Sequence, residues 1–212
     1  MTGAGGGSEA MPGLTTARLD ALREVANIGA GHAATALSTL TASLIMISVP
    51  HVNVVPPGEF IPEVPPDEEV VAVQMTMSGD IAGGTVFVLP TDAGVRLAER
   101  MLQRKRGSSS VLGEIEQSAL KEAGNILAGA YLTALSDFLH MRLMLSPPAL
   151  ETGTTASVLS TINRREPRAE APILCVETEF FMEEPSESLH GFFLLVPNAA
   201  AFAAIFRAVR VD

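Results

Sequence analysis

The segment ALREVANIGAGHAATALSTL, at residues 21–40, recurs at residues 119–138 as ALKEAGNILAGAYLTALSDF. Aligned without gaps at an offset of 98, the two segments are identical at 11 of 20 positions. Two unrelated amphipathic helices would share leucine and alanine, but they would not usually share glutamate, asparagine, glycine and threonine in the same register. Self-similarity at a fixed offset is typical of an internal repeat, so the sequence predicts a domain built from two copies of one unit.

A weaker sign of duplication follows each of these segments. The stretch GTVFVLP at residues 84–90 resembles GFFLLVP at residues 191–197. Its offset is 107, which predicts extra loop residues in the second copy. We therefore expect one domain over residues 14–212, made of two repeats at about 14–106 and 111–210.

The periodicity of apolar residues predicts the order of helices and strands. Helices are expected over residues 16–40, 92–103, 112–139 and 198–209, and strands over residues 44–55, 69–77, 84–89, 141–146, 155–162, 172–182 and 189–196. This order favours an α+β, sandwich-like fold. We expect the two copies to share one mixed or antiparallel sheet about a pseudo-twofold axis.

The composition excludes several classes of protein. Of the 212 residues, 47% are hydrophobic and 18% are charged, and the net charge is −10. Such a chain can bury a core, but it lacks the clustered cations that a nucleic-acid surface needs. The three cations of Arg104–Arg106 stand beside Gly107 and a run of serines, a composition typical of a solvated loop. Cys175 is the only cysteine, so an intrachain disulfide framework is excluded.

The sequence also carries no sign of membrane insertion or export. No apolar run reaches the roughly 18 residues that a membrane-spanning helix needs. Residues 1–13 are rich in glycine and lack the charged and apolar parts of a signal peptide. We therefore expect a disordered tail over residues 1–13 and a cytoplasmic protein.

Each long helix carries a narrow polar stripe opposite its apolar face. Successive residues of a helix are about 100° apart, so residues three, four and seven apart share a face. The stripe of the first copy comprises Asp20, Glu24, Asn27 and Gly31, and the stripe of the second copy comprises Ser118, Glu122, Asn125 and Gly129.

The asparagine and glycine of these stripes are unfavourable in the interior of a helix. Asparagine competes with the backbone for hydrogen bonds, and glycine costs about 0.8–1 kcal/mol relative to alanine. Because both residues are present in both copies, we infer that they meet a requirement other than the stability of the helix. One explanation is that each glycine lets another surface approach the neighbouring carboxylate and amide. The other is that Gly31 and Gly129 let the two helices pack together, with Asn27 and Asn125 bonded across that seam.

The extended spacing of the two copies resembles the signature of a known family. It reads Asp20-x3-Glu24-x2-Asn27-x22-Pro50 in the first copy and Ser118-x3-Glu122-x2-Asn125-x22-Pro148 in the second. This duplicated pattern resembles that of the CheC family, shared in part by CheX and FliY, whose members are phosphatases of the chemotaxis response regulator CheY. The resemblance covers residues 14–210 and implies a pseudo-symmetric α/β fold with two long helices side by side on one face.

The resemblance implies that this chain hydrolyses an aspartyl phosphate on a separate CheY-like receiver domain. Asn27 and Asn125 would each position the attacking water, whereas Glu24 and Glu122 would dock against a lysine of the receiver. The receiver would supply Mg²⁺, so we expect no cofactor or metal in this chain. The resemblance also suggests a CheD-like deamidase as a partner, and we expect neither nucleic-acid binding nor membrane insertion.

A non-catalytic role is the alternative. The chain could be a binding module of the chemotaxis or flagellar-switch system, such as an adaptor for the response regulator or for a CheD-like protein. The two Glu/Asn pairs argue against this alternative, because simple docking does not need an amide in the middle of a helix twice.

Overall fold

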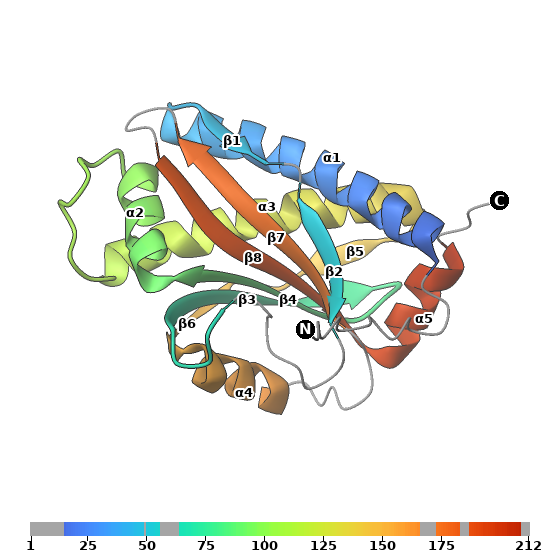
Figure 1. The fold of residues 1–212 in the computed structure, drawn as a ribbon. Helices are drawn as coiled ribbons and strands as arrows, with labels where there is room; N and C mark the ends of the chain where they lie inside the picture. The colour runs from blue at the N-terminus through green and yellow to red at the C-terminus, as the bar shows by residue number, and fades with distance from the viewer. Residues whose placement is uncertain (1–14, 49, 56–63, 166–172, 183–186, 209–212) are drawn as a thin grey trace, which may run out of the picture.

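The computed structural model describes residues 15–48, 50–55, 64–165, 173–182 and 187–208 (Figure 1). The tail that the sequence predicts over residues 1–13 lies outside the described residues. The helices are α1 (Thr16–Thr41), α2 (Thr91–Met101), α3 (Glu114–Leu139), α4 (Thr155–Arg165) and α5 (Ala199–Ala208). The strands are β1 (Ile45–Ile47), β2 (His51–Val55), β3 (Glu69–Gly79), β4 (Gly83–Pro90), β5 (Leu143–Leu145), β6 (Ala149–Thr154), β7 (Ile173–Met182) and β8 (Glu187–Pro197).

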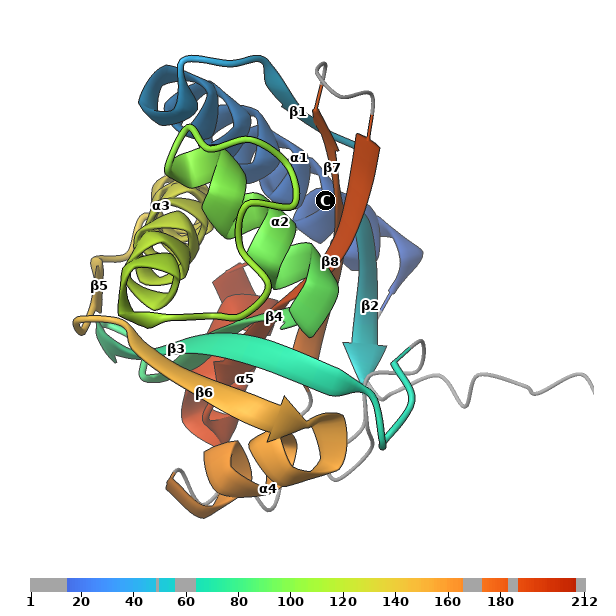
Figure 2. The ribbon, with the colours of Figure 1, turned by 90° about the vertical axis from the view of Figure 1, so that its left-hand side faces the viewer.

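All described strands join one antiparallel sheet, which confirms the expected fold class. The order along the sheet is β1-β7-β8-β4-β3-β5, with β2 also paired to β7 and β6 also paired to β3. Apolar residues of α1, α2, α3 and α5 share a core with one face of the sheet, while α4 packs on a smaller core against the other face. The two long helices α1 and α3 lie side by side on the first face (Figure 2).

Each repeat contributes edge strands to the half of the sheet that belongs to the other repeat. The strands β1 and β2 of the first copy pair with β7 of the second, and β5 and β6 of the second copy pair with β3 of the first. The registers match as well, because Val52 lies opposite Val176 just as Leu150 lies opposite Val73. Neither repeat therefore has a complete sheet of its own.

The pseudo-twofold axis corrects one detail of the sequence comparison. At the centre of the sheet Phe87 lies opposite Phe193, and both belong to the core beneath the long helices. Their neighbours Val86 and Phe192 both belong to the core on the other face. The structural offset of these strands is therefore 106, not the 107 that the sequence similarity indicates. An alignment that is one residue out of register would place equivalent side chains on opposite faces of the sheet.

One expected strand is wrong. Residues 155–162, expected as a strand, begin the helix α4, and the preceding strand β6 was not expected. β-Branched residues favour strands, but Thr155, Val158 and Leu159 follow a helical i, i+3, i+4 spacing and face the smaller core. The N-cap of α1 is Thr15, whose hydroxyl accepts a hydrogen bond from the Arg18 N–H at 3.3 Å. The strand expected over residues 44–55 is divided into β1 and β2, and the remaining expected elements are confirmed to within a few residues.

Two buried carboxylates hold the segment that joins the repeats. Glu99, only 3% exposed, accepts hydrogen bonds from the N–H groups of Ser109 at 2.7 Å and Gly107 at 3.0 Å. Glu116, in the first turn of α3, pairs with Arg104 at 2.5 Å. Burial alone raises the pKa of Glu99, but the backbone donors outweigh burial and bring its pKa below the ordinary value. Arg104 is exposed, as expected for a loop, while Glu99 of α2 and Glu116 of α3 bind the residues of this loop.

Removing the charge of Glu99 is expected to destabilise the fold. Glu99→Gln keeps one of the two acceptor oxygens and replaces the other with an NH2 group, so one of the two backbone N–H groups then faces a donor. We expect this loss to cost about 2 kcal/mol at pH 7, measured by urea denaturation. Because the folded-state pKa of Glu99 is lowered, its contribution is present above the ordinary value of 4.5 and is lost as the pH falls through the folded-state pKa. The difference between wild type and variant should therefore shrink in acid. The exposed Glu114 provides a control, since Glu114→Gln removes the same charge without a buried partner.

Candidate functional site

The two Glu/Asn pairs lie on the outer faces of the long helices. Glu24 and Asn27 on α1 are exposed, as are Glu122 and Asn125 on α3. The apolar sides of the same helices face the sheet, where Leu22, Val25, Ala26, Ala30, Ala33 and Leu37 of α1 are buried. The amides and carboxylates are therefore accessible to another molecule rather than sealed between the helices.

The glycines of the two stripes do not serve helix packing. Gly31 is exposed and Gly129 is half-buried, and a Cβ atom added at either would meet nothing within 4 Å. This result rules out the explanation that these two glycines bring the helices together. Asn27 and Asn125 are exposed as well, so they are not buried in a seam.

A different glycine closes the contact between the two helices. A Cβ atom on the buried Gly29 would lie 2.5 Å from Cδ1 of Tyr131 and 2.9 Å from its Cα. Tyr131 in turn stacks on Phe193, with ring centroids 4.8 Å apart, and its hydroxyl lies 3.3 Å from Oγ1 of Thr178. Burial raises the pKa of Tyr131 to about 12. The sequence carried a signal for this contact, because Gly29 corresponds to Leu127 and therefore breaks the repeat.

The two pairs form separate sites rather than one composite site. The helices run antiparallel (Figure 1), and the contact of Gly29 with Tyr131 brings Gly31 level with Gly129. Asn27 and Asn125 each precede those glycines by four residues, so they lie about 6 Å to either side, or about 12 Å apart along the helices. The helix axes add a further separation of about 8–10 Å. One phosphoryl group could not reach both amides.

The surroundings of the two sites differ. In the first copy Asp20 pairs with Arg23 at 2.9 Å, an exposed ion pair that contributes little stability. Ser118 takes the place of Asp20 in the second copy, and the neighbouring Ile115 is 57% exposed. Beside the first pair, Ile28 is 45% exposed. Each Glu/Asn pair therefore has an exposed isoleucine near it, but at different positions along the stripe.

The distant prolines of the two spacings occupy structural positions. Pro50 is buried and directly precedes β2, while Pro148 is half-buried and directly precedes β6. At the start of a strand the missing N–H of proline is tolerated. Each proline therefore stands immediately before a strand, and neither is part of the polar stripes.

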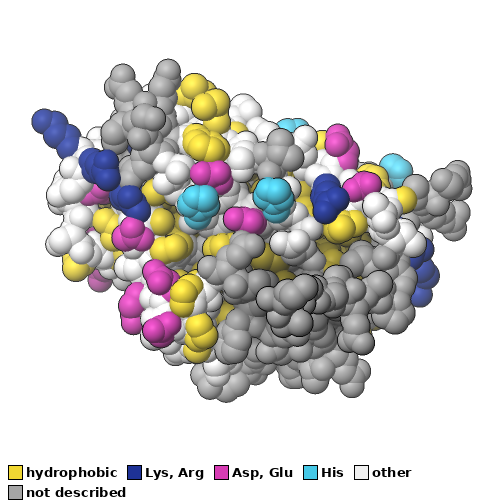
Figure 3. Space-filling model, in the orientation of Figure 1, with side chains coloured by type: hydrophobic (Ala, Val, Ile, Leu, Met, Phe, Trp, Pro, Cys, Tyr) yellow, Lys and Arg dark blue, Asp and Glu magenta, His cyan; other side chains and the backbone are white. Residues whose placement is uncertain are grey.

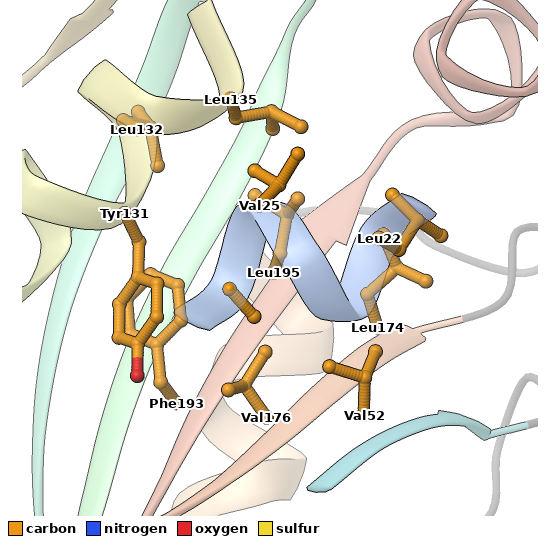
Figure 4. A pocket seen from close by; sticks show the side chains of 11 residues that line it. Leu22, Val25, Val52, Tyr131, Leu132, Leu135, Leu174, Val176, Phe193 and Leu195 are labelled. Carbon is orange, nitrogen blue, oxygen red and sulfur yellow. The ribbon is translucent and has the colours of Figure 1, made fainter. Parts of the chain in front are cut away.

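An apolar cavity lies under α1, on the side away from the polar stripe. It has a volume of about 40 Å³ and extends between the two helices and the sheet (Figure 4). Its walls include Leu22 and Ala26 of α1, Leu132 of α3 and Val176 of β7. No charged side chain lines it, so the candidate chemistry belongs to the outer surface of the helices.

The opposite face of the sheet carries histidines and acidic residues over β2, β7 and β8 (Figure 3). There His51 is the cross-strand neighbour of Glu177, and Nε2 of His190 lies 3.4 Å from Oε1 of Glu179. Among the described residues, however, no group of three histidine, cysteine, aspartate or glutamate side chains is arranged to hold a metal ion. Within the same described ranges, none of the helices has the length and apolar character to cross a membrane.

Two segments match the model of one family. Residues 18–54 and 115–151 each match the CheC-like family, and each segment spans one long helix and the two short strands that follow it. The two matches thus coincide with the repeated unit and include both Glu/Asn pairs.

Similar proteins are found among curated sequences and solved structures. The chain is 30% identical to the CheY-P phosphatase CheC of Bacillus subtilis over 200 residues, which cover 93% of this chain and 96% of that protein. It is 32% identical over 139 residues to the flagellar motor switch phosphatase FliY of the same organism, covering 65% of this chain and 36% of FliY. The crystal structure of Thermotoga maritima FliY superposes with a TM-score of 0.74 at 24% identity, covering 92% of this chain and 97% of that one.

The same fold occurs in a flagellar switch protein. The middle domain of FliM from H. pylori superposes with a TM-score of 0.66 at 15% identity, covering 92% of this chain and 99% of that chain. At this identity the likeness concerns the fold alone. The match of both repeats to one family model, together with a relative that spans nearly the whole chain at 30% identity, shows that this chain belongs to the CheC-like family.

Proposed function

We propose that this protein is a phosphatase that hydrolyses the aspartyl phosphate of a CheY-like response regulator. The observation that carries the proposal is the exposure of both Glu/Asn pairs on the outer faces of α1 and α3. Two relatives support it, since their names describe a CheY-P phosphatase and a flagellar motor switch phosphatase. Because receivers of this kind act in the cytoplasm, we propose the same location for this protein.

Asn27 and Asn125 each position the attacking water in this mechanism. Phosphoryl transfer passes through a loose transition state, so positioning and electrostatics supply most of the acceleration. An amide both donates and accepts hydrogen bonds, and it can therefore hold a water in line with the bond that breaks. A carboxylate at the same place would repel the phosphoryl oxygens.

Glu24 and Glu122 dock the receiver. Each lies one turn before the asparagine of its pair, on the same exposed stripe. A lysine of the receiver that approaches this stripe would form a charge-assisted hydrogen bond with the carboxylate. That contact sets the distance between the amide and the acyl phosphate, so the glutamates act on binding and register.

The receiver supplies the Mg²⁺ that neutralises the phosphoryl oxygens. This division of labour requires only an amide and a carboxylate from each site of this chain. Hydrolysis should accordingly depend on Mg²⁺ through the receiver, and Mg²⁺ alone should not bind to this protein in calorimetry.

A turnover experiment separates the phosphatase from a binding module. The receiver is phosphorylated with acetyl phosphate, and release of inorganic phosphate is followed with far fewer molecules of this protein than of receiver. A phosphatase drains phosphoryl groups from many receivers in turn. A binding module would instead leave the rate at that of the receiver alone, or would lower it in proportion to the complex formed, and either outcome would refute the proposal.

A CheD-like deamidase is the second partner that we propose, on the family resemblance. Co-elution of the two purified proteins in size-exclusion chromatography tests this interaction. Two separate peaks at concentrations well above the micromolar range would exclude it.

A further inference from the structure

Two glycines on the outer faces of the long helices have no structural reason to be glycine. Gly31 on α1 and Gly129 on α3 lie inside regular helices, and neither has a positive φ. A Cβ atom at either would meet open space. Glycine in such a position costs about 0.8–1 kcal/mol relative to alanine. Both helices therefore lose stability without gaining backbone freedom or internal packing.

The buried glycines of the same helices show the contrast. A Cβ atom on Gly29 would collide with Tyr131, and one on Gly124 would lie 2.7 Å from Cγ1 of Val73 in the sheet. Those two glycines serve the approach of one element to another within the fold. Gly31 and Gly129 are also glycines, but no atom of the described part of the chain lies where their Cβ atoms would be, so nothing in that part explains them.

The direction of helical side chains shows what a larger residue would cover. A Cα–Cβ bond in a helix is tilted toward the N-terminus, and a side chain covers the turn that precedes its own residue. A side chain at position 31 would therefore lean over Asn27, and one at position 129 would lean over Asn125. The Gly31 carbonyl accepts a hydrogen bond from the Thr35 hydroxyl at 2.9 Å, and α1 continues past this position to Thr41.

We propose that Gly31 and Gly129 determine access to the two asparagine amides. This inference rests on the proposed phosphatase function and identifies the partner surface as a recessed acyl phosphate. The bare helix backbone beside each amide leaves room for the rim of the receiver's cleft. The rim can then descend until only one water separates the amide from the phosphorus. The glycines are thus specificity-determining residues, and the asparagines remain the catalytic ones.

The test isolates the first site by the change Asn125→Ala and then varies position 31. In that background Gly31→Leu is expected to lower kcat/KM for the phosphorylated receiver by at least about tenfold. Gly31→Ala should lower it less and should raise Tm by roughly 2–4 °C, because alanine is the better helix former and has open space around it. A protein that becomes more stable and less active at once cannot have lost activity by unfolding.

Ala36→Leu is the matched control. Ala36 is an exposed residue of the same helix but lies about 120° away from Glu24, outside the stripe. A leucine side chain at that position should leave the rate of the first site unchanged. Binding of the receiver charged with beryllium fluoride, an acyl-phosphate mimic, should weaken for Gly31→Leu and not for Ala36→Leu.

The outcomes separate this inference from the proposed function. If the Asn125→Ala protein turns over and Gly31→Leu retains its rate and its affinity, the role of the glycines is wrong while the phosphatase stands. If the unmodified protein releases no phosphate beyond that of the receiver alone, both proposals fail.

Discussion

Replacing Asn27 and Asn125 together with alanine is expected to lower receiver dephosphorylation by about 100-fold, because an attacking water is no longer aimed at the phosphorus. Each single replacement should leave partial activity, since the two amides belong to separate sites about 12 Å apart along the helices. The measurement is release of inorganic phosphate from a receiver charged with acetyl phosphate. The unfolding transition should not move to lower temperature, because both side chains are exposed.

Asn53 provides a matched control for this experiment. It is an exposed asparagine of β2, and its strand lies in the sheet rather than on the long helices. Asn53→Ala removes the same amide and should leave the rate intact. Asn27→Asp in the Asn125→Ala background is a sharper probe, because it keeps the shape and adds a charge that repels the phosphoryl oxygens. Wild-type turnover by the double alanine variant would show that the amides do not position the water.

Replacing Gly29 with alanine is expected to destabilise the fold by about 3 kcal/mol. The added Cβ would lie 2.5 Å from the ring and 2.9 Å from the Cα of Tyr131. Neither atom can move freely, since the ring is stacked on Phe193 and the Cα belongs to α3. The helices must therefore move apart. Urea denaturation of wild type and variant gives the change in the free energy of unfolding.

Gly31→Ala is the control for this stability measurement. It makes the same chemical change two residues along the same helix, but the added atom meets nothing within 4 Å. Its free energy of unfolding should rise by roughly 1 kcal/mol, the difference in helix propensity. Equal effects of the two alanines would contradict the packing role assigned to Gly29.

Local periodicity was enough to predict most elements. The stripes of α1 and α3 follow from the spacing of Glu24, Asn27 and their copies, because residues three and four apart always share a helix face. The alternating pattern of the strand segments and the long connections favoured a mixed or antiparallel sheet over a parallel one, without deciding between the two. The helix α4 was missed because the local preference of its β-branched residues for strands was overridden by packing of Val158 against the other side of the sheet.

The role of each glycine could not be settled from the spacing alone. Gly29 and Gly31 stand two residues apart, and only the position of Tyr131 shows that the first is a packing residue and the second is not. The sequence offered one partial signal, since Gly31 recurs as Gly129 while Gly29 does not recur. Whether a recurring glycine faces a neighbour or open space depends on an element 100 residues away.

The sequence by itself determined that this chain holds two copies of a helix with a glutamate and an asparagine on one polar stripe, because the face of a helix is a property of neighbouring residues. Only the tertiary structure showed that both stripes face outward. Only the tertiary structure decided that the copies exchange their edge strands, that α1 and α3 meet at Gly29 and Tyr131, and that the two sites are separate. These are relations between distant segments. They depend on how side chains from different elements fill a common core, which no local spacing records.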